Sequence, residues 1–146
     1  MKLYLVRHGD ARRNEPRPLS GRGIKESRKV AKHLLDMGIE ISAIFYSKEL
    51  RAKETAGIFS RKLGVEPSEV AGLNPGDNPR TWFKKIGEIG EDVMLVGHLP
   101  HLTLLLSLLL AGSDADLVDF RKSSIICLEG SGDHWIMKYF LTPESI

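Results

Sequence analysis

The sequence predicts an α/β protein, a three-layer α/β/α sandwich around a mostly parallel sheet with an antiparallel end. Short apolar runs of strand length alternate along the chain with longer stretches in which apolar residues recur at helical spacing. The run 93–96 is apolar without alternation, as in a strand that is covered on both faces. The last two runs, near 124–129 and 134–140, flank a Gly-Ser-Gly-Asp sequence and predict an antiparallel hairpin.

The first strand is expected in the apolar run 3–6, which is too short for a helix of ordinary length. A polar loop, 10–18, follows this run and contains prolines and several arginines. Ser20 is expected to be the N-cap of the first helix, and Gly38 is expected to end it. The chain is thus expected to leave the first strand through a basic loop and to return along a helix.

The second strand is expected in the apolar run 41–46. Ser47 is expected to cap a second helix, which ends at Gly64. A short third strand is expected within 65–70. The sequence 73–79 is rich in proline, asparagine and glycine, and this composition predicts a loop.

In the second half of the chain, a helix is expected over 80–89 and a buried strand over 92–97. The leucine-rich stretch 102–111 is far shorter than the roughly 20 residues that a membrane-spanning helix needs. We therefore expect it to be a core helix. A polar turn at 112–116 is expected to lead into the last two strands.

The composition is that of an ordinary globular protein, and the length of 146 residues predicts one domain, 1–146. A net charge of only +2 argues against a polyelectrolyte partner. The histidines lack metal-ligand spacing, so no metal and no cofactor are expected. The single cysteine, Cys127, lies in an apolar run and is expected to be a buried thiol. No signal peptide is recognised, because Arg7 interrupts the first apolar run, and we expect a cytoplasmic protein.

Two of the apolar runs end in histidine, at His8 and at His98. Because ligands bind at the carboxyl ends of parallel strands, both imidazoles are expected at one edge of the sheet. Arg7 precedes the first histidine, and Arg51 lies near the expected start of the second helix, at the same edge. One crevice would then hold two histidines and two arginines, which suits an anion. Taken singly, each residue also has a structural explanation, such as a helix cap or a solvated arginine.

The chemistry that suits these four residues is phosphoryl transfer. A neutral imidazole can attack phosphorus and carry the phosphoryl group as a covalent intermediate. Planar guanidinium groups match the non-bridging oxygens bidentately, and donors fixed in advance stabilise the transition state.

The chain resembles the histidine phosphatase superfamily, also called phosphoglycerate mutase-like, in an ordered series of short motifs. Within this superfamily it is most similar to the small SixA-type phosphohistidine phosphatases. The resemblance runs from about Leu3 to Leu128. The matching pieces are the RHG motif Arg7-His8-Gly9 with Asp10-Ala11, Arg17-Pro18-Leu19-Ser20 with Gly23, Ser47 to Thr55 with Arg51-Ala52, Asn74-Pro75-Gly76-Asp77, and Gly97-His98-Leu99-Pro100.

The resemblance implies a phosphoglycerate mutase-like fold and a covalent phosphohistidine intermediate on His8. It also implies that Arg7, Arg51 and His98 form the remainder of the phosphate pocket. Further phosphate or substrate contacts are expected from Gly9, Asn14 and Ser20.

The chain departs from the family's frequent residues at Lys48, where the family often has proline, and at Glu54, where it often has glutamine. Larger members carry a long insertion before the strand of the second histidine, and this insertion supplies a glutamate proton donor. The corresponding interval is short here. Asp10 and Asp77 are possible proton donors, and both are equally well explained as turn residues that shape loops.

A site without a strong acid favours a substrate whose leaving group needs little protonation. Phosphohistidine has a labile P–N bond and a leaving imidazole that takes up a proton readily. We therefore expect a metal-independent phosphatase that acts on phosphohistidine in a protein, for example in a histidine phosphotransfer domain. The alternatives are a small-molecule phosphomonoesterase of the same superfamily and a non-catalytic phosphoprotein-binding module. A nucleic-acid partner is not expected, because the arginine-rich loop lacks aromatic stacking residues nearby, and no membrane partner is expected.

Overall fold

All six strands form one sheet, in the order β3-β2-β4-β1-β5-β6. The computed structural model describes residues 1–113, 115 and 117–146. Strands β1 to β4 pair in parallel, whereas β5 and β6 add an antiparallel end, as the sequence predicts. The strands are β1 (Lys2–Arg7), β2 (Ala43–Tyr46), β3 (Pro67–Glu69), β4 (Val93–Gly97), β5 (Ile125–Ser131) and β6 (His134–Leu141).

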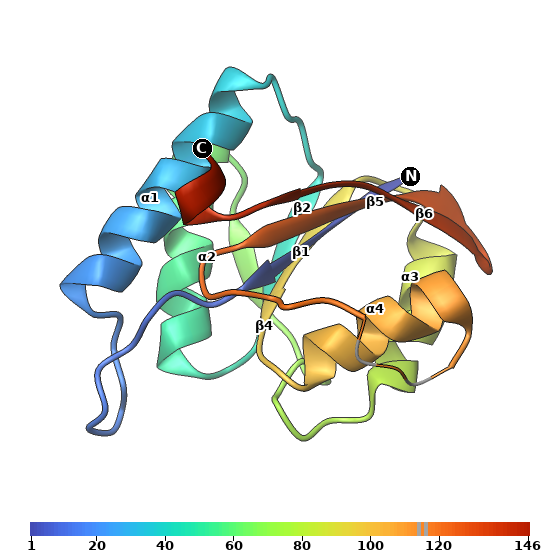
Figure 1. Ribbon diagram of the computed structural model, residues 1–146, viewed down its shortest axis with the longest axis horizontal. Helices are drawn as coiled ribbons and strands as arrows, with labels where there is room; N and C mark the ends of the chain where they lie inside the picture. Colours follow the sequence, from blue (N-terminus) through green and yellow to red (C-terminus); the bar gives the residue numbers. More distant parts are fainter. Residues whose placement is uncertain (114, 116) are drawn as a thin grey trace.

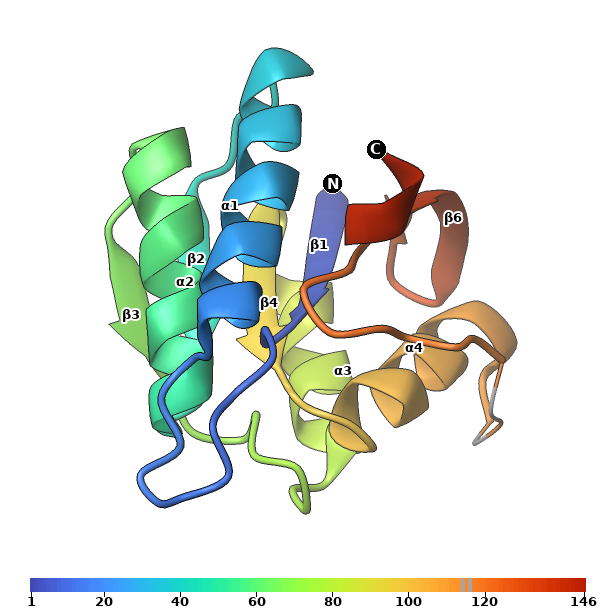
Figure 2. The ribbon, with the colours of Figure 1, turned by 60° about the vertical axis from the view of Figure 1, so that its left-hand side comes forward.

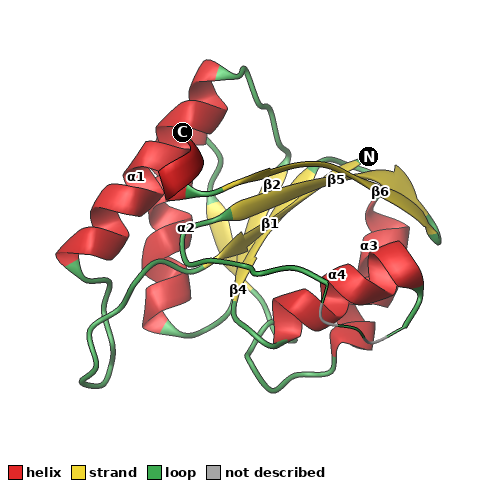
Figure 3. Cartoon of the chain, viewed as in Figure 1, coloured by secondary structure: helices red, strands yellow, loops and turns green. Residues whose placement is uncertain are grey.

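Two pairs of helices cover the two faces of the sheet, which confirms the three layers (Figures 1 and 2). Helices α1 (Gly21–Asp36) and α2 (Leu50–Leu63) lie on one face, and α3 (Pro79–Ile89) and α4 (His101–Ala111) lie on the other. A final 3-10 turn, η1 (Pro143–Ser145), packs against α1. Figure 3 shows that loops at the ends of the strands connect α1, α2 and α3 to their neighbouring strands.

Strand β1 lies inside the sheet, between β4 and β5, and both of its faces are buried. Tyr4 and Val6 pack under α1 and α2, whereas Leu3 and Leu5 pack under α3 and α4. Successive side chains of a strand point to opposite faces, so an apolar run without alternation belongs in the middle layer. The buried core therefore fixes the position of the residues that follow β1.

The expected start of α1 and end of α2 are confirmed, α3 and α4 each begin one residue earlier than predicted, and the start of α2 differs in its cap. Ser20 is the N-cap of α1, and its hydroxyl accepts a hydrogen bond from the Gly23 N–H at 3.1 Å. Gly64 ends α2 in a left-handed conformation with a φ of 73°. The prediction that Ser47 caps α2 is wrong, because the N-cap is Glu49. The chain needs the intervening residues to turn from β2 into the helix, and Ser47 is buried below that turn.

One strand and one turn are shorter than expected. The third strand forms only over Pro67–Glu69, and the turn of the last hairpin is confined to positions 132 and 133. The expected turn at 112–116 lies partly outside the described residues, since positions 114 and 116 are not among them. Across the described chain, every helix is too short or too polar to cross a membrane. Cys127 is a free, buried thiol.

Candidate active site

The two histidines that end apolar strands lie next to each other at the carboxyl edge of the sheet. Strands β1 and β4 are parallel neighbours, with Arg7 in register with Gly97. The His8 N–H donates to the carbonyl oxygen of Gly97 at 3.0 Å. The imidazole rings of His8 and His98 are therefore close, with centroids 4.9 Å apart and an angle of 50° between their planes.

His8 is held in one tautomer. Its Nδ1 lies 2.7 Å from the carbonyl oxygen of Gly9, and a carbonyl oxygen only accepts, so Nδ1 carries the hydrogen. The lone pair of the ring is then on Nε2. Burial has the largest effect on the pKa of His8, which is lowered to about 4 in total. The Gly9 carbonyl opposes this shift, and the charges of Arg51, Arg7 and Lys122 add to it. The imidazole is thus neutral at pH 7, with an unprotonated Nε2.

His98 is also neutral but is bound differently. Burial lowers its pKa to about 3, with further contributions from His8 and Arg51. Its Nε2 lies 2.5 Å from the hydroxyl oxygen of Ser47, which explains why this serine is unavailable as a helix cap. A hydroxyl can donate or accept, so this contact allows either tautomer. The Nδ1 of His98 is buried and has no hydrogen-bond partner among the described residues.

Two arginines place positive charge beside these rings. Arg7 donates from Nη1 to the carbonyl oxygen of Phe120 at 2.8 Å, and burial lowers the pKa of its guanidinium. Arg51 is only 11% exposed, and its Nη1 lies 3.6 Å from a carboxylate oxygen of Glu49. Within the described chain, the Nε–H groups of both arginines are buried without acceptors. Free donors and cations beside a neutral imidazole form a site for a phosphoryl group.

Gly9 lets the end of β1 fit between three elements. Its N–H donates to the Thr55 hydroxyl at 3.0 Å, and that hydroxyl donates to the Arg51 carbonyl oxygen at 2.8 Å. A Cβ at Gly9 would lie 2.9 Å from Ser27 Oγ and 3.0 Å from the carbonyl oxygen of Gly23. Glycine is therefore required here by close packing. Thr55 connects the loop that follows β1 to the first turn of α2, which carries Arg51.

Asp10 is ionised and bound to two donors. Its carboxylate accepts a hydrogen bond from the Ser20 hydroxyl at 2.7 Å and pairs with Lys122 Nζ at 3.1 Å. The Ser20 hydrogen bond has the largest effect and lowers its pKa. Desolvation opposes this shift, and the Lys122 contacts lower the pKa further. A lowered pKa disfavours the protonated form that a general acid needs.

The remaining expected site residues lie in loops. Asn14 is exposed, and its carbonyl oxygen accepts from the Arg17 N–H at 2.8 Å within the loop that follows β1. Asp77 accepts from the Asn74 N–H at 2.9 Å, and its own N–H donates to the Asn74 carbonyl oxygen at 3.1 Å. These bonds give Asp77 a role in shaping the turn before α3. Of the two departures from the family, Glu54 accepts from the Leu19 N–H at 2.7 Å and ties that loop to α2.

The segment before β5 also contacts the residues at the end of β1, a contact that the sequence analysis does not predict. The Ser123 N–H donates to the carbonyl oxygens of Arg7 and His8 at 3.1 and 3.2 Å. The Ser124 carbonyl oxygen accepts from the Arg7 N–H at 3.1 Å. Because β5 runs antiparallel to β1, the residues before β5 lie at the same edge as the residues after β1. In the sequence, this contact is indicated by the basic and polar residues that come just before the apolar run of β5.

An α/β protein that places a neutral imidazole beside buried arginines at one edge of its sheet has the groups that phosphoryl transfer requires. The chain is a member of the histidine phosphatase superfamily, since the model of its branch 1 matches residues 3–77. An uncharacterized protein of Picosynechococcus sp. is 31% identical over 140 residues, covering 88% of this chain and 84% of that protein. The phosphohistidine phosphatase SixA of Escherichia coli is 27% identical over 143 residues, covering 91% of this chain and 89% of SixA.

Solved structures of phosphatases share the fold. A structure of the protein histidine phosphatase SixA complexed with tungstate has a TM-score of 0.88 at 24% identity, covering 98% of this chain and 97% of that chain. A phosphoserine phosphatase of Entamoeba histolytica has a TM-score of 0.76 at 15% identity, covering 99% of this chain and 98% of that chain. At such identities the likeness concerns the fold, and it confirms the predicted fold class.

Proposed function

We propose that the protein transfers a phosphoryl group from its substrate to Nε2 of His8 and then to water. The observation that carries this proposal is the hydrogen bond between His8 Nδ1 and the Gly9 carbonyl oxygen, which leaves Nε2 with its lone pair. Burial keeps the ring neutral, so the nucleophile is ready at pH 7 without a base to deprotonate it.

In the first step, Nε2 forms a bond to phosphorus as the bond from phosphorus to the leaving group breaks. The imidazole of His8 becomes cationic, and the Gly9 carbonyl oxygen stabilises that charge through Nδ1–H. Arg7 and Arg51 donate to the non-bridging oxygens, which carry the negative charge in the transition state. His98 is the fourth member of this pocket and donates to the same oxygens from Nδ1, the ring nitrogen that Ser47 does not contact, when that nitrogen carries the hydrogen.

In the second step, water attacks the phosphorus and the P–Nε2 bond breaks. One proton of the water is released, inorganic phosphate leaves, and the His8 ring returns to its neutral tautomer with Nδ1 still protonated. The same pocket serves both steps because the charge on the non-bridging oxygens is the same.

We propose phosphohistidine in a protein as the substrate, in the cytoplasm. Two arguments support this choice: the similarity to SixA, and the ionised state of Asp10, which leaves no strong acid at that position. An alkyl leaving group departs as an alkoxide and needs a proton, whereas a leaving imidazole requires much less assistance.

A small phosphomonoester is the second candidate substrate. The observation in its favour is the shared fold with a phosphoserine phosphatase. Such a substrate would require a proton donor, and Asp77 and Asp10 are the carboxyl groups to replace first.

The test compares phosphohistidine, p-nitrophenyl phosphate and 3-phosphoglycerate as substrates of one preparation, with EDTA present throughout. We expect kcat/KM to be far higher for the first two, and vanadate to inhibit. Acid quenching is not suitable for trapping the intermediate, because phosphohistidine is acid-labile, so the reaction is quenched in base and the phosphoprotein is detected. Equal kcat/KM values for 3-phosphoglycerate would establish a working acid and move the proposal to the small phosphomonoester. Failure to label wild-type His8 would overturn the mechanism.

A further inference from the structure

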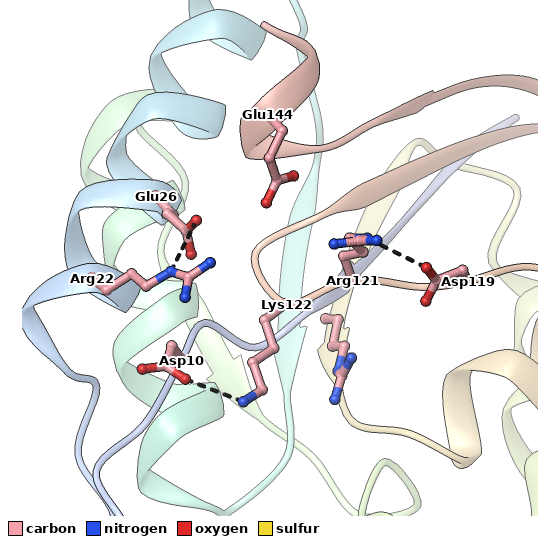
Figure 4. Close-up of a pocket in the computed structure, with 8 residues that line it drawn as sticks. Asp10, Arg22, Glu26, Asp119, Arg121, Lys122 and Glu144 are labelled. Atoms are coloured by element: carbon pink, nitrogen blue, oxygen red, sulfur yellow. Dashed lines mark hydrogen bonds and ion pairs between the residues drawn. The ribbon is translucent and has the colours of Figure 1, made fainter.

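A charged pocket continues the candidate active site along the sheet edge, from the end of β1 toward the start of β5 (Figure 4). Its volume is about 340 Å³, within the size range of small ligand sites. Arg7 lines it, so the pocket borders the proposed phosphate site. Its lining consists of the cations Arg7, Arg22, Arg121 and Lys122 and the carboxylates Asp10, Glu26, Asp119 and Glu144.

Most of these charges neutralise one another. What remains after pairing is Arg7, beside the nucleophile, and Glu144, which has no ion pair within 4 Å among the described residues. The backbone N–H of Glu144, the Thr142 side chain and the nearby charges of Arg121 and Arg22 lower the pKa of the Glu144 carboxyl, so it is ionised and able to pair with a cation. The three pairs are Arg22 with Glu26 at 3.4 Å, Lys122 with Asp10 at 3.1 Å, and Arg121 with Asp119 at 3.3 Å.

Glu144 is presented by a rigid turn. In η1, the Thr142 hydroxyl accepts from the Ser145 N–H at 3.2 Å, and the Ser145 hydroxyl accepts from the Thr142 N–H at 2.9 Å. Lys29 Nζ donates to the Pro143 carbonyl oxygen at 2.8 Å and fastens this turn to α1. Figure 4 shows the Glu144 carboxylate directed into the pocket, from the end opposite Asp10 and Lys122. The pocket thus contains one cation, Arg7, and one carboxylate, Glu144, that have no ion-pair partner among the described residues.

We propose that this pocket is a leaving-group subsite that binds a lysine or arginine side chain of the substrate protein, near its phosphorylated residue. The phosphoryl group lies against Arg7, and the substrate's cation pairs with Glu144. Glu26 is a second acceptor for that cation, because its partner Arg22 is exposed and can exchange. This inference rests on the proposed function, and it names a feature that the substrate must carry.

The experiment uses two matched pairs of substrates. The first pair consists of phosphohistidine peptides that differ in one residue near the phosphohistidine, lysine or norleucine, with the position varied. The second pair is 4-(2-aminoethyl)phenyl phosphate and 4-ethylphenyl phosphate, which differ in an ammonium group and do not depend on phosphohistidine cleavage. Each pair is assayed with wild type, with Glu144→Gln, and with Glu88→Gln as a control on the exposed face of α3.

We expect wild type and Glu88→Gln to prefer the lysine peptide by about fivefold in kcat/KM, as for a partly exposed ion pair. Glu144→Gln should abolish this preference and leave p-nitrophenyl phosphate turnover unchanged, and high salt should reduce the preference in wild type. An equal preference in Glu144→Gln would overturn the assignment, as would the absence of any preference in wild type.

The two pairs separate the two proposals. If the peptides are not cleaved but the aryl phosphates are, the proposed phosphohistidine substrate is wrong, and the aryl pair still decides whether Glu144 selects a cation. If the aryl pair shows the preference but both peptides are cleaved equally, the proposal that the pocket binds a basic side chain of a protein is wrong. The ligand would then be a small phosphorylated amine.

Discussion

His8 and His98 follow two neighbouring strands at the same edge of the sheet, yet their surroundings differ. The end of β1 is fixed on several sides, by Gly97, Thr55 and Ser123, and the His8 ring has a single tautomer with Nε2 free. At the end of β4, His98 uses its Nε2 in a contact with Ser47. In each ring, the hydrogen bond on one nitrogen decides what the other nitrogen can do. We therefore assign attack on phosphorus to His8 and charge stabilisation to His98.

The largest expected effect separates these two roles directly. His98→Ala should lower kcat by about 10²- to 10³-fold, as for loss of one transition-state donor, while phosphoprotein still forms slowly. His8→Ala should form no phosphoprotein at all, because it lacks the atom that bonds to phosphorus. Rapid quench in base, followed by detection of phosphohistidine, measures both. If His98→Ala also failed to become labelled in long incubations, the two histidines would not have the separate roles that we propose.

Close packing around the end of β1 should make it intolerant of a methyl group. Gly9→Ala places a Cβ within 3.0 Å of the Gly23 carbonyl oxygen and of Ser27 Oγ, so we expect a stability loss of about 1–3 kcal/mol. The matched control is Gly21→Ala at the start of α1, where a Cβ meets no atom within 4 Å. Urea denaturation measures both variants. Equal stability of the two would show that the β1 end can relax.

Acid should destabilise the fold through both histidines. Their pKa values of about 4 and about 3 lie below the ordinary value near 6.5, so below pH 6.5 the unfolded chain binds protons that the folded chain does not. Their contribution to stability is fully present above pH 6.5 and is lost as the pH falls to the folded values. His8→Asn should remove up to about 1.4 kcal/mol per pH unit of this dependence. Urea unfolding between pH 4 and 7 measures it, and an unchanged slope would mean that His8 is charged when folded.

The smallest expected effect concerns the contact that distinguishes His98. Ser47→Ala removes the hydrogen-bond partner of His98 Nε2. We expect kcat to fall about three- to tenfold, which corresponds to the free energy of one buried hydrogen bond. Phosphorylation of His8 should still occur, since the Ser47 hydroxyl that is removed contacts the ring of His98. Ser60→Ala, on the far part of α2, is a suitable control. A loss as large as that of His98→Ala would indicate that Ser47 has a role beyond holding the ring.

Apolar runs and helical spacing are local patterns, so the sequence alone predicts the ends of the two strands that precede His8 and His98. It also predicts that Arg7 and Arg51 lie at the same edge. It also indicated the family, through motifs that keep their order along the chain. Only the tertiary structure decided that Ser47 contacts His98, that Ser123 holds the end of β1, and that Asp10 pairs with Lys122. These partners are separated by 51 to 116 positions in the chain, and a pattern read along the chain carries no information about such pairs. They form because buried polar groups must find hydrogen-bond partners wherever the packed layers bring them together.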